Sequence, residues 1–327
     1  MAHGGNVEDM RGLFLEDSKL TYREDLPAPE PGADDTLVDV IQAGVCATDL
    51  ALSRGYMGFT GVPGHEFVGV ARTGPLAGKR VVGDINAACG TCETCVAGNP
   101  HHCPNRTVLG IFQHGGAFAE QLYLPTRNLL EVPETVASDA ATFVEPLAAA
   151  FEIGEQVKLE VGQRALVAGD GKLGLLCAWA LHVAGVTVTV AGRHAERSEL
   201  LPDAVELRTG MLEQDAVQDV KFDVVVEATG RESVLPRVLA FVRPRGTIVL
   251  KTTTEAATTI DLSPLVVDEI TMVGSRCGPF DKALAALADG TVPVEKMIDA
   301  RFPLRDGVEA FARAGAGGVL KVLVEPG

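Results

Sequence analysis

The chain is short of positive charge. Its 28 lysine and arginine residues are outnumbered by 44 aspartate and glutamate residues, so the formal net charge at pH 7 is -16. The field of such a protein repels both the phosphate backbone of nucleic acids and the headgroups of anionic lipids. We therefore expect neither nucleic acid nor an acidic membrane surface as a partner.

We expect neither a hydrophobic leader nor a membrane span. Residues 1–12, MAHGGNVEDMRG, contain no basic segment followed by an apolar one, so we expect no secretory signal and a cytoplasmic protein. The uncharged run 173–192 is long enough to cross a membrane. However, Gly185 divides it into a helical half and a β-branched half, as in a buried helix and strand of an α/β domain.

Length and composition indicate two globular domains. The chain has 327 residues, of which 46% are hydrophobic and 22% charged, and a domain commonly takes about 150 residues. In the first part, short apolar runs alternate with Gly, Pro, Asp and Asn turns, which predicts an irregular, mostly antiparallel β domain. From Gln163 onward, strands alternate with helices, which is typical of a doubly wound parallel sheet.

The last part of the chain predicts a return to the first domain. After Gly278 the pattern indicates two more helices and two strands, the second of them in LKVLVEP. These elements can complete the β domain and leave the parallel sheet as an insertion. The predicted division is therefore 1–147 with 278–327 for the β domain, and 148–277 for the parallel-sheet domain.

A glycine motif, GDGKLG, follows a predicted strand and opens a predicted helix, the context that a dinucleotide-binding loop requires. We expect Gly169 to permit a tight turn, Gly171 to let a pyrophosphate approach the backbone, and Gly174 to let helix and strand pack closely. Lys172 and Leu173 complete the candidate cofactor loop. The alternative is a strand-to-helix turn whose glycines have only a steric role.

The end of the next predicted strand bears on cofactor choice. An acid there normally binds the 2'-hydroxyl of the adenine ribose, but the sequence reads VAGRHAER and places Gly192 and Arg193 at that point. A small residue leaves room for a 2'-phosphate, with which Arg193 and Arg197 can pair. NADP is thus favoured over NAD, unless the arginines only begin the next helix in solvent. Thr229 and Thr252 follow later strands and are assigned to the same cleft.

Four of the seven cysteines lie within the segment 86–106 in the pattern C-x2-C-x2-C-x7-C. In the reducing compartment that we expect, clustered cysteines indicate a metal before a disulfide. Four thiolates suit a closed, tetrahedral structural zinc site. We prefer these ligands over the neighbouring His101 and His102. The predicted ligands are Cys89, Cys92, Cys95 and Cys103.

The motifs together resemble the zinc-dependent medium-chain alcohol dehydrogenases, including the sorbitol, threonine and glucose dehydrogenase branches. The resemblance covers nearly the whole chain and rests on GVCATDL, GHEFVG, the four-cysteine lobe, EPLAAA, GDGKLG and VVVEATG, which occur in the order of the family. It implies a GroES-like catalytic domain, a Rossmann domain, and a second, catalytic zinc in the cleft between them.

The resemblance also implies a ligand set for the catalytic zinc. Cys46 and His65 match the first two ligands, and Asp49 matches the carboxylate that orients the ligand histidine. The third ligand is Glu66 or Glu145, and the two can exchange as substrate enters. Such a set leaves one coordination position open, as a catalytic zinc requires.

The expected proton path is incomplete. Thr48 matches the hydroxyl that takes the proton of the substrate, but many family members then have a histidine five residues after the first cysteine ligand, where this chain has Ala51. The path must end in water or in another group. His114 is one candidate, although a histidine in such a glycine-rich loop is more often simply solvated.

The expected function is hydride transfer between an alcohol or polyol and NADP, which gives an aldehyde or ketone while zinc acts as the Lewis acid. One alternative is a zinc-independent enone or quinone reductase of the same superfamily. Another is a nucleotide-binding redox sensor without catalysis.

The exposed edge of the strand in EITMVGS predicts a homodimer or homotetramer.

Overall fold

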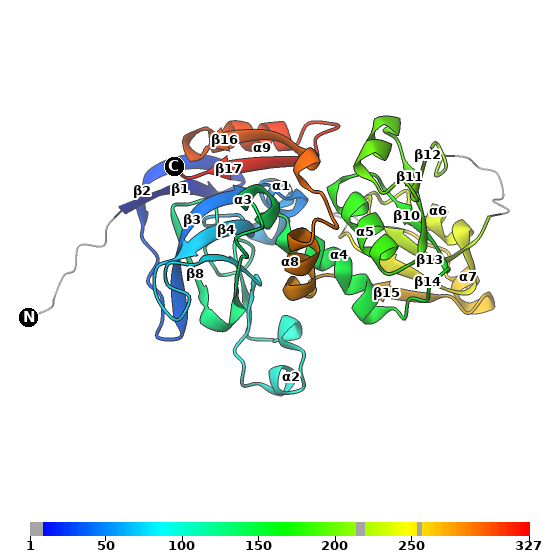
Figure 1. Cartoon of the computed structure of the whole chain (residues 1–327), viewed down its shortest axis with the longest axis horizontal. Coiled ribbons are helices and arrows are strands. Elements are labelled where there is room, and N and C mark those ends of the chain that lie inside the picture. The colour runs from blue at the N-terminus through cyan, green and yellow to red at the C-terminus, as the bar shows by residue number, and fades with distance from the viewer. Residues whose placement is uncertain (1–8, 214–219, 254–256) are drawn as a thin grey trace, which may run out of the picture. The chain divides into compact units, whose positions relative to one another are not determined.

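The computed structural model describes residues 9–213, 220–253 and 257–327 (Figure 1). The chain divides into two compact units, Met1–Glu145 with Leu284–Gly327, and Pro146–Ala283. The second unit is therefore an insertion in the sequence of the first. Within the described residues, no helix is long and apolar enough to span a membrane.

The first unit is built on a mostly antiparallel sheet in the order β16-β17-β3-β4-β5-β9, with β8 also paired to β3. Along β3 (Asp35–Gly44), buried and partly exposed residues alternate, as expected for a strand with one face on the core. The C-terminal strand β17 (Lys321–Glu325) pairs antiparallel with β3, so the end of the chain completes this sheet. The other strands are β4 (Glu66–Ala71), β5 (Arg80–Gly83), β8 (Gln121–Pro125), β9 (Leu129–Glu131) and β16 (Ile298–Pro303).

Smaller elements surround this sheet. The strands β1 (Asp9–Glu16) and β2 (Lys19–Pro27) form an antiparallel pair, and β6 (Asn86–Ala87) pairs with β7 (Thr107–Val108) at the base of the cysteine lobe. The helix α9 packs against β16 and β17 and buries Phe311 against Phe118, with 5.2 Å between the ring centroids. The helices of this unit are α1 (Ala47–Leu52), α2 (Glu93–Val96), α3 (Ser138–Ala141) and α9 (Gly307–Ala314).

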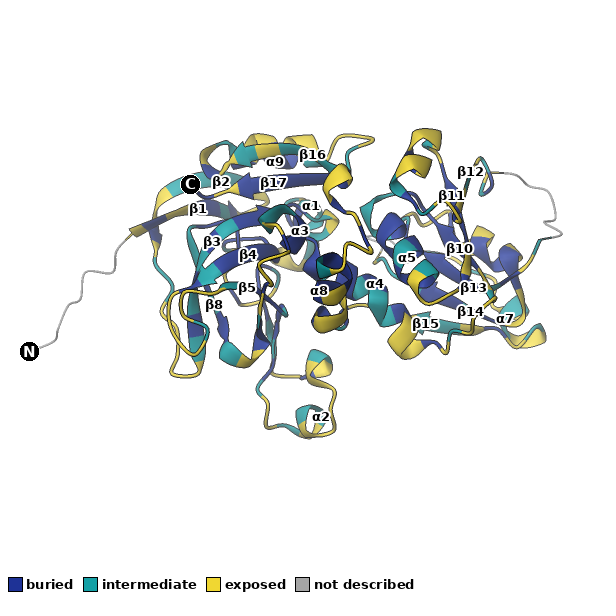
Figure 2. Ribbon diagram, viewed as in Figure 1, coloured by how far each residue is buried: buried dark blue, intermediate teal, exposed yellow. Residues whose placement is uncertain are grey.

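The second unit is a six-stranded parallel sheet in the order β12-β11-β10-β13-β14-β15. This order is that of the doubly wound dinucleotide-binding fold, which confirms the predicted fold class. Figure 2 shows the central strands as buried, and in β10 the residues from Ala165 to Ala168 are fully buried. The strands are β10 (Arg164–Ala168), β11 (Thr187–Gly192), β12 (Glu206–Thr209), β13 (Phe222–Glu227), β14 (Val242–Leu250) and β15 (Thr271–Gly274).

Helices in this part of the chain are α5 (Lys172–Val183), α6 (Leu235–Val238) and α7 (Ser263–Val267), while α4 (Val144–Gln156) and α8 (Phe280–Ala288) run across the divisions between the units. The uncharged run 173–192 forms α5 and β11, which turn at Gly185 with φ +80°. Ala195–Leu200 forms a 3-10 helix. α6 begins beside Pro236, which is tolerated near a helix start, and a 3-10 turn, Leu239–Phe241, follows it directly.

Candidate metal and cofactor sites

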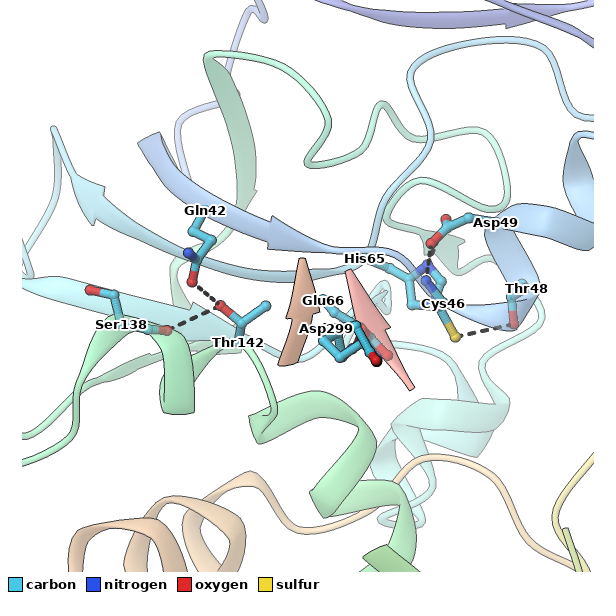
Figure 3. Close-up of polar contacts among 10 residues, drawn as sticks. Gln42, Cys46, Thr48, Asp49, His65, Glu66, Ser138, Thr142 and Asp299 are labelled. Atoms are coloured by element: carbon cyan, nitrogen blue, oxygen red, sulfur yellow. Dashed lines mark hydrogen bonds and ion pairs between the residues drawn. The ribbon is translucent and has the colours of Figure 1, made fainter. Parts of the chain in front are cut away.

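Cys46 is positioned by the first turn of a short helix. It is the N-cap residue of α1, and its backbone N–H donates a hydrogen bond of 2.8 Å to the carboxylate of Asp49. The other oxygen of Asp49 lies 3.3 Å from Nδ1 of His65 (Figure 3), and the Asp49 side chain is fully buried. One carboxylate therefore fixes both the backbone of Cys46 and the ring of His65.

His65 enters the site from a tight glycine turn directly before β4. Gly64 has φ +104°, and a Cβ at this position would lie 2.8 Å from the ring of Phe118 and 2.9 Å from the Phe118 backbone nitrogen. Because no larger residue fits there, the glycine of GHEF is required for the approach of His65 to the site. With Nδ1 facing Asp49, Nε2 is the nitrogen available to a metal.

The ligand atoms of Cys46, His65 and Glu66 all lie within 4.8 Å of one another. Burial by itself would lower the pKa of His65, but the charges of Asp49 and Cys46 outweigh this effect and raise the pKa well above 6.5. The pocket thus favours a positive charge. A thiolate, an imidazole and a carboxylate are donors that zinc binds, so the residues fit a catalytic zinc.

A lysine that the sequence analysis did not single out is buried next to this cluster. Lys321, at the start of β17, forms an ion pair with Glu66, and both side chains are 0% exposed. Its Nζ also lies 4.9 Å from the ring centroid of Phe143. Gly44 leaves room for the pair, since a Cβ there would lie 2.7 Å from Glu66 Oε2 and 2.9 Å from Lys321 Nζ. The available sequence signal was a lysine at the edge of the apolar strand KVLVE.

The two candidate third ligands, Glu66 and Glu145, differ in their distance from the other ligand atoms. Among the described residues, the metal-competent group that contains Cys46 includes Glu66 and does not include Glu145, which lies half-buried in the first turn of α4. Thr48 belongs to the site, with Oγ1 3.9 Å from Sγ of Cys46.

His114 has a structural role that the sequence did not indicate. Its ring is buried, Nδ1 lies 3.0 Å from the hydroxyl of Thr107, and Nε2 lies 2.9 Å from the carbonyl oxygen of Tyr123. Both ring nitrogens therefore bind the loop to its neighbours. The expectation of a solvated histidine is wrong, and the ring has no nitrogen left for a proton path to solvent.

The cysteine lobe brings its four thiols together. Separations between the sulfur atoms range from 3.5 to 4.0 Å, and a tetrahedral zinc with Zn–S bonds of about 2.3 Å places its sulfurs about 3.8 Å apart. Backbone N–H groups of Thr91 and Cys92 lower the pKa of Cys89 to about 5, which favours a thiolate. His101 instead contacts Asp84 at 2.6 Å. The group that fits a closed zinc site is Cys89, Cys92, Cys95 and Cys103.

The glycine loop has the form that a pyrophosphate requires. Gly169 has φ +113°, and a Cβ on Gly174 would lie 2.0 Å from the carbonyl oxygen of Gly169, so helix and strand approach too closely for a side chain. Gly171, the N-cap of α5, has open space where its Cβ would be. Lys172 and Leu173 form the first, half-buried positions of α5. The bare backbone at this helix start fits a bound phosphate group.

The end of β11 differs from the expectation. A Cβ on Gly192 would lie 2.6 Å from the side chain of Asp170, so the expected space is already occupied. Asp170 Oδ2 accepts hydrogen bonds of 2.8 Å from the N–H groups of Arg193 and His194. Buried Arg197 donates to the Asp170 carbonyl oxygen at 2.6 Å, whereas the Arg193 side chain is exposed. In the sequence, the one available signal for this contact was that the second residue of the motif GDGKLG is an aspartate.

Thr229 and Thr252 are held by one buried carboxylate at the end of β13. Glu227 accepts a hydrogen bond of 2.7 Å from the N–H of Thr229 and further bonds from the hydroxyl groups of both threonines. The carboxyl ends of the strands are where ligands bind in open parallel sheets. Both threonines therefore lie at the edge of this sheet that is suited to a dinucleotide.

Residues 32–134 match the alcohol dehydrogenase GroES-like domain, and residues 138–325 match the glucose dehydrogenase C-terminus. L-threonine 3-dehydrogenase of Saccharopolyspora erythraea is 32% identical, over 92% of this chain and 94% of the relative. A zinc-binding dehydrogenase of Sinorhizobium meliloti 1021, solved with NADP, has a TM-score of 0.86 at 28% identity, over 97% of this chain and 99% of that one. An alcohol dehydrogenase of Escherichia coli CFT073, solved with NADH, has a TM-score of 0.88 at 26% identity, with the same two coverages of 97% and 99%.

Proposed function

Since this chain belongs to the zinc-dependent medium-chain alcohol dehydrogenases, we propose that it transfers a hydride between an alcohol and a nicotinamide dinucleotide. The product of oxidation is an aldehyde or ketone. The observation that carries the proposal is the convergence of Cys46, His65 and Glu66, with Asp49 behind the histidine ring. A zinc-independent reductase of the superfamily would have no need for these four groups together.

Each residue then has a chemical role. Cys46 supplies a thiolate, His65 supplies Nε2, and Glu66 supplies the third donor in preference to Glu145. Asp49 keeps the imidazole ring in orientation through Nδ1. When bound, zinc supplies Lewis-acid polarisation of the alcohol and the dinucleotide supplies the hydride acceptor. Thr48 takes up the proton of the substrate hydroxyl.

The proton then passes to water. The half-buried Ala51 on α1 carries no group that can accept it, and both nitrogens of His114 are engaged by Thr107 and Tyr123. A water molecule next to Thr48 is the simplest remaining acceptor. Because buffer bases can accept the proton in place of a relay histidine, the rate of the enzyme should depend on buffer concentration more than in an enzyme whose relay uses a histidine.

The cofactor of the proposed reaction is a nicotinamide dinucleotide held by the glycine loop, with its pyrophosphate at Gly171. The sequence favoured NADP on two grounds, the small Gly192 and the basic Arg193. Asp170 occupies the space beside Gly192 and so removes the first ground, while the exposed side chain of Arg193 keeps the second. The choice between the two dinucleotides therefore depends on Asp170.

Self-association is part of the proposal. β15 is the last strand of the parallel sheet, and the preceding helix α7 has strongly exposed apolar residues, Val266 at 77% and Val267 at 79%. Exposed apolar side chains next to an open sheet edge support pairing between copies. We expect a homodimer or homotetramer, which sedimentation velocity on the intact protein would measure.

L-Threonine is the first substrate to test, because the relative from Saccharopolyspora erythraea is named for it. The assay follows reduced-nicotinamide absorbance with zinc-loaded protein, a panel of simple alcohols, polyols and L-threonine, and both NAD and NADP. The variant Cys46→Ser should lose the catalytic zinc and turnover. The matched control is Cys177→Ser, which changes a fully buried cysteine of α5. Turnover by Cys46→Ser equal to that of the control would refute the proposed function.

A further inference from the structure

Asp170 brings a carboxylate to the end of β11 from an unusual place in the sequence. It is the second residue of the loop GDGKLG, yet its Cβ, Cγ and Oδ2 all lie 2.6 Å from the point where a Cβ on Gly192 would be. In a doubly wound fold an acid at the end of this strand binds the adenine ribose. In this chain, the glycine at position 192 and the aspartate at position 170 together place a carboxylate in the same region.

We propose that Asp170 is the residue that selects the dinucleotide, by accepting the 2'-hydroxyl of the adenine ribose and disfavouring a 2'-phosphate. The chain then binds NADH in preference to NADPH, contrary to the preference that Gly192 and Arg193 indicated in the sequence. This inference rests on the proposed function, because it assumes that the glycine loop binds a nicotinamide dinucleotide.

The hydrogen-bond donors at this point support the inference. Two successive backbone N–H groups, of Arg193 and His194, would suit a phosphate oxygen. Both already donate to Asp170 Oδ2, and Nδ1 of His194 lies 3.0 Å from the same oxygen. An incoming 2'-phosphate would have to displace the carboxylate to reach these donors. A hydroxyl requires no such displacement, because it donates to the carboxylate.

The second oxygen of Asp170 retains capacity to accept a hydrogen bond. Within the described parts of the chain, its one charged partner is the guanidinium of Arg197 at 3.5 Å, which is longer than a normal hydrogen bond. The same arginine donates to the carbonyl oxygen of Asp170 at 2.6 Å and is itself buried. Arg197 therefore stabilises the glycine loop and is not positioned to pair with the 2'-phosphate of NADP.

The charge at this site also favours the hydroxyl. Burial by itself would raise the pKa of Asp170, but the N–H groups of Arg193 and His194, the His194 ring and Arg197 outweigh it, so the pKa lies below 3.8 and the group is ionised at neutral pH. A phosphate monoester carries a charge of about -1.5 to -2 at that pH. The exposed guanidinium of Arg193 offsets little of the resulting repulsion, because solvent screens it.

Fluorescence titration of zinc-loaded protein with NADH and with NADPH tests the inference by binding alone. We expect the wild type to bind NADH more tightly by about ten- to a hundredfold, the value of one hydrogen bond to a charged group. Asp170→Asn should remove most of this ratio. The control Asp223→Asn changes another carboxylate that accepts a backbone N–H, from Arg164 at 2.7 Å, but at the opposite end of the strands, and it should leave the ratio unchanged.

The outcomes separate the two proposals. Equal or tighter binding of NADPH by the wild type overturns the role of Asp170 and leaves the dehydrogenase proposal standing, and this result does not depend on whether a variant folds. If Asp170→Asn weakens the binding of NADH and of NADPH equally, so that the ratio is unchanged, the proposed selection of the dinucleotide is also overturned. Asp170 would then only stabilise the loop. Binding of neither dinucleotide by the wild type overturns the proposed function and this inference with it. Gly192→Asp is unsuitable as a test, because its side chain would collide with Asp170.

Discussion

Replacement of Lys321 by methionine should destabilise the first unit far more than an ordinary change at a lysine. Lys321 and Glu66 are both fully buried, and each is the charged partner of the other. In metal-free Lys321→Met, the side chain keeps much of its volume against Phe143, but the buried carboxylate of Glu66 loses the charge of the lysine. The variant therefore measures the cost of removing one charge from a buried ion pair.

The expected magnitude follows from that burial. Removal of one partner from a buried ion pair costs about 3 to 5 kcal/mol. With a urea dependence of about 1 to 3 kcal/mol per molar, the unfolding midpoint should fall by about 1 to 5 M. The double variant Lys321→Met with Glu66→Gln should recover part of this loss, since the buried charge is then absent as well.

Urea unfolding of protein from which a chelator has removed bound metal, followed by circular dichroism, measures the effect without a zinc ion at Glu66. The matched control is Lys79→Met, whose pair with Glu131 spans 3.0 Å but has side chains that are 57% and 49% exposed; because solvent screens this pair, the variant should leave the unfolding midpoint nearly unchanged. Fluorescence of Trp179, the single tryptophan, follows the other unit separately. Equal midpoints for Lys321→Met and Lys79→Met would refute the reasoning.

Three further predictions concern other parts of the chain. Cys92→Ser should lower the melting temperature and should reduce the zinc content by one ion per chain, while turnover per folded molecule stays unchanged. A loss of turnover at unchanged stability would contradict a structural role for the zinc of the cysteine lobe. Gly171→Ala should weaken NADH binding without loss of stability, whereas Gly174→Ala should lower stability because its Cβ would lie 2.0 Å from the carbonyl oxygen of Gly169; equal melting temperatures for the two variants would contradict this. Burial lowers the pKa of His114 below 6.5, so its contribution to stability is complete above that pH and is lost as the pH falls toward the folded-state pKa. His114→Gln should therefore show a smaller fall in unfolding free energy between about pH 7.5 and 5.5 than the wild type, and an equal fall would contradict it.

The sequence could predict features whose residues are close together along the chain. The four cysteines of the lobe lie within fifteen positions, and their spacing alone indicates a common metal. The glycines of GDGKLG act within one turn, so the strand before them and the helix after them predict a phosphate site. The alternation of strands and helices predicted the parallel sheet, which the structure confirms. The short 3-10 helix Ala195–Leu200 was harder to predict, because apolar spacing does not distinguish it from an α-helix over so few residues.

By itself, the sequence indicated the two kinds of domain and the four thiolates of the lobe, because these depend on local spacing and composition. The family and the candidate ligands of the catalytic zinc came from the resemblance that several motifs carry together. The tertiary structure decided what depends on contacts between distant positions. It placed Glu66, and not Glu145, with Cys46 and His65, and it paired Glu66 with a lysine 255 positions away. It also placed Asp170 in the space beside Gly192. These contacts depend on how loops and strands that are far apart in the sequence pack against one another, which the local spacing of residues does not specify.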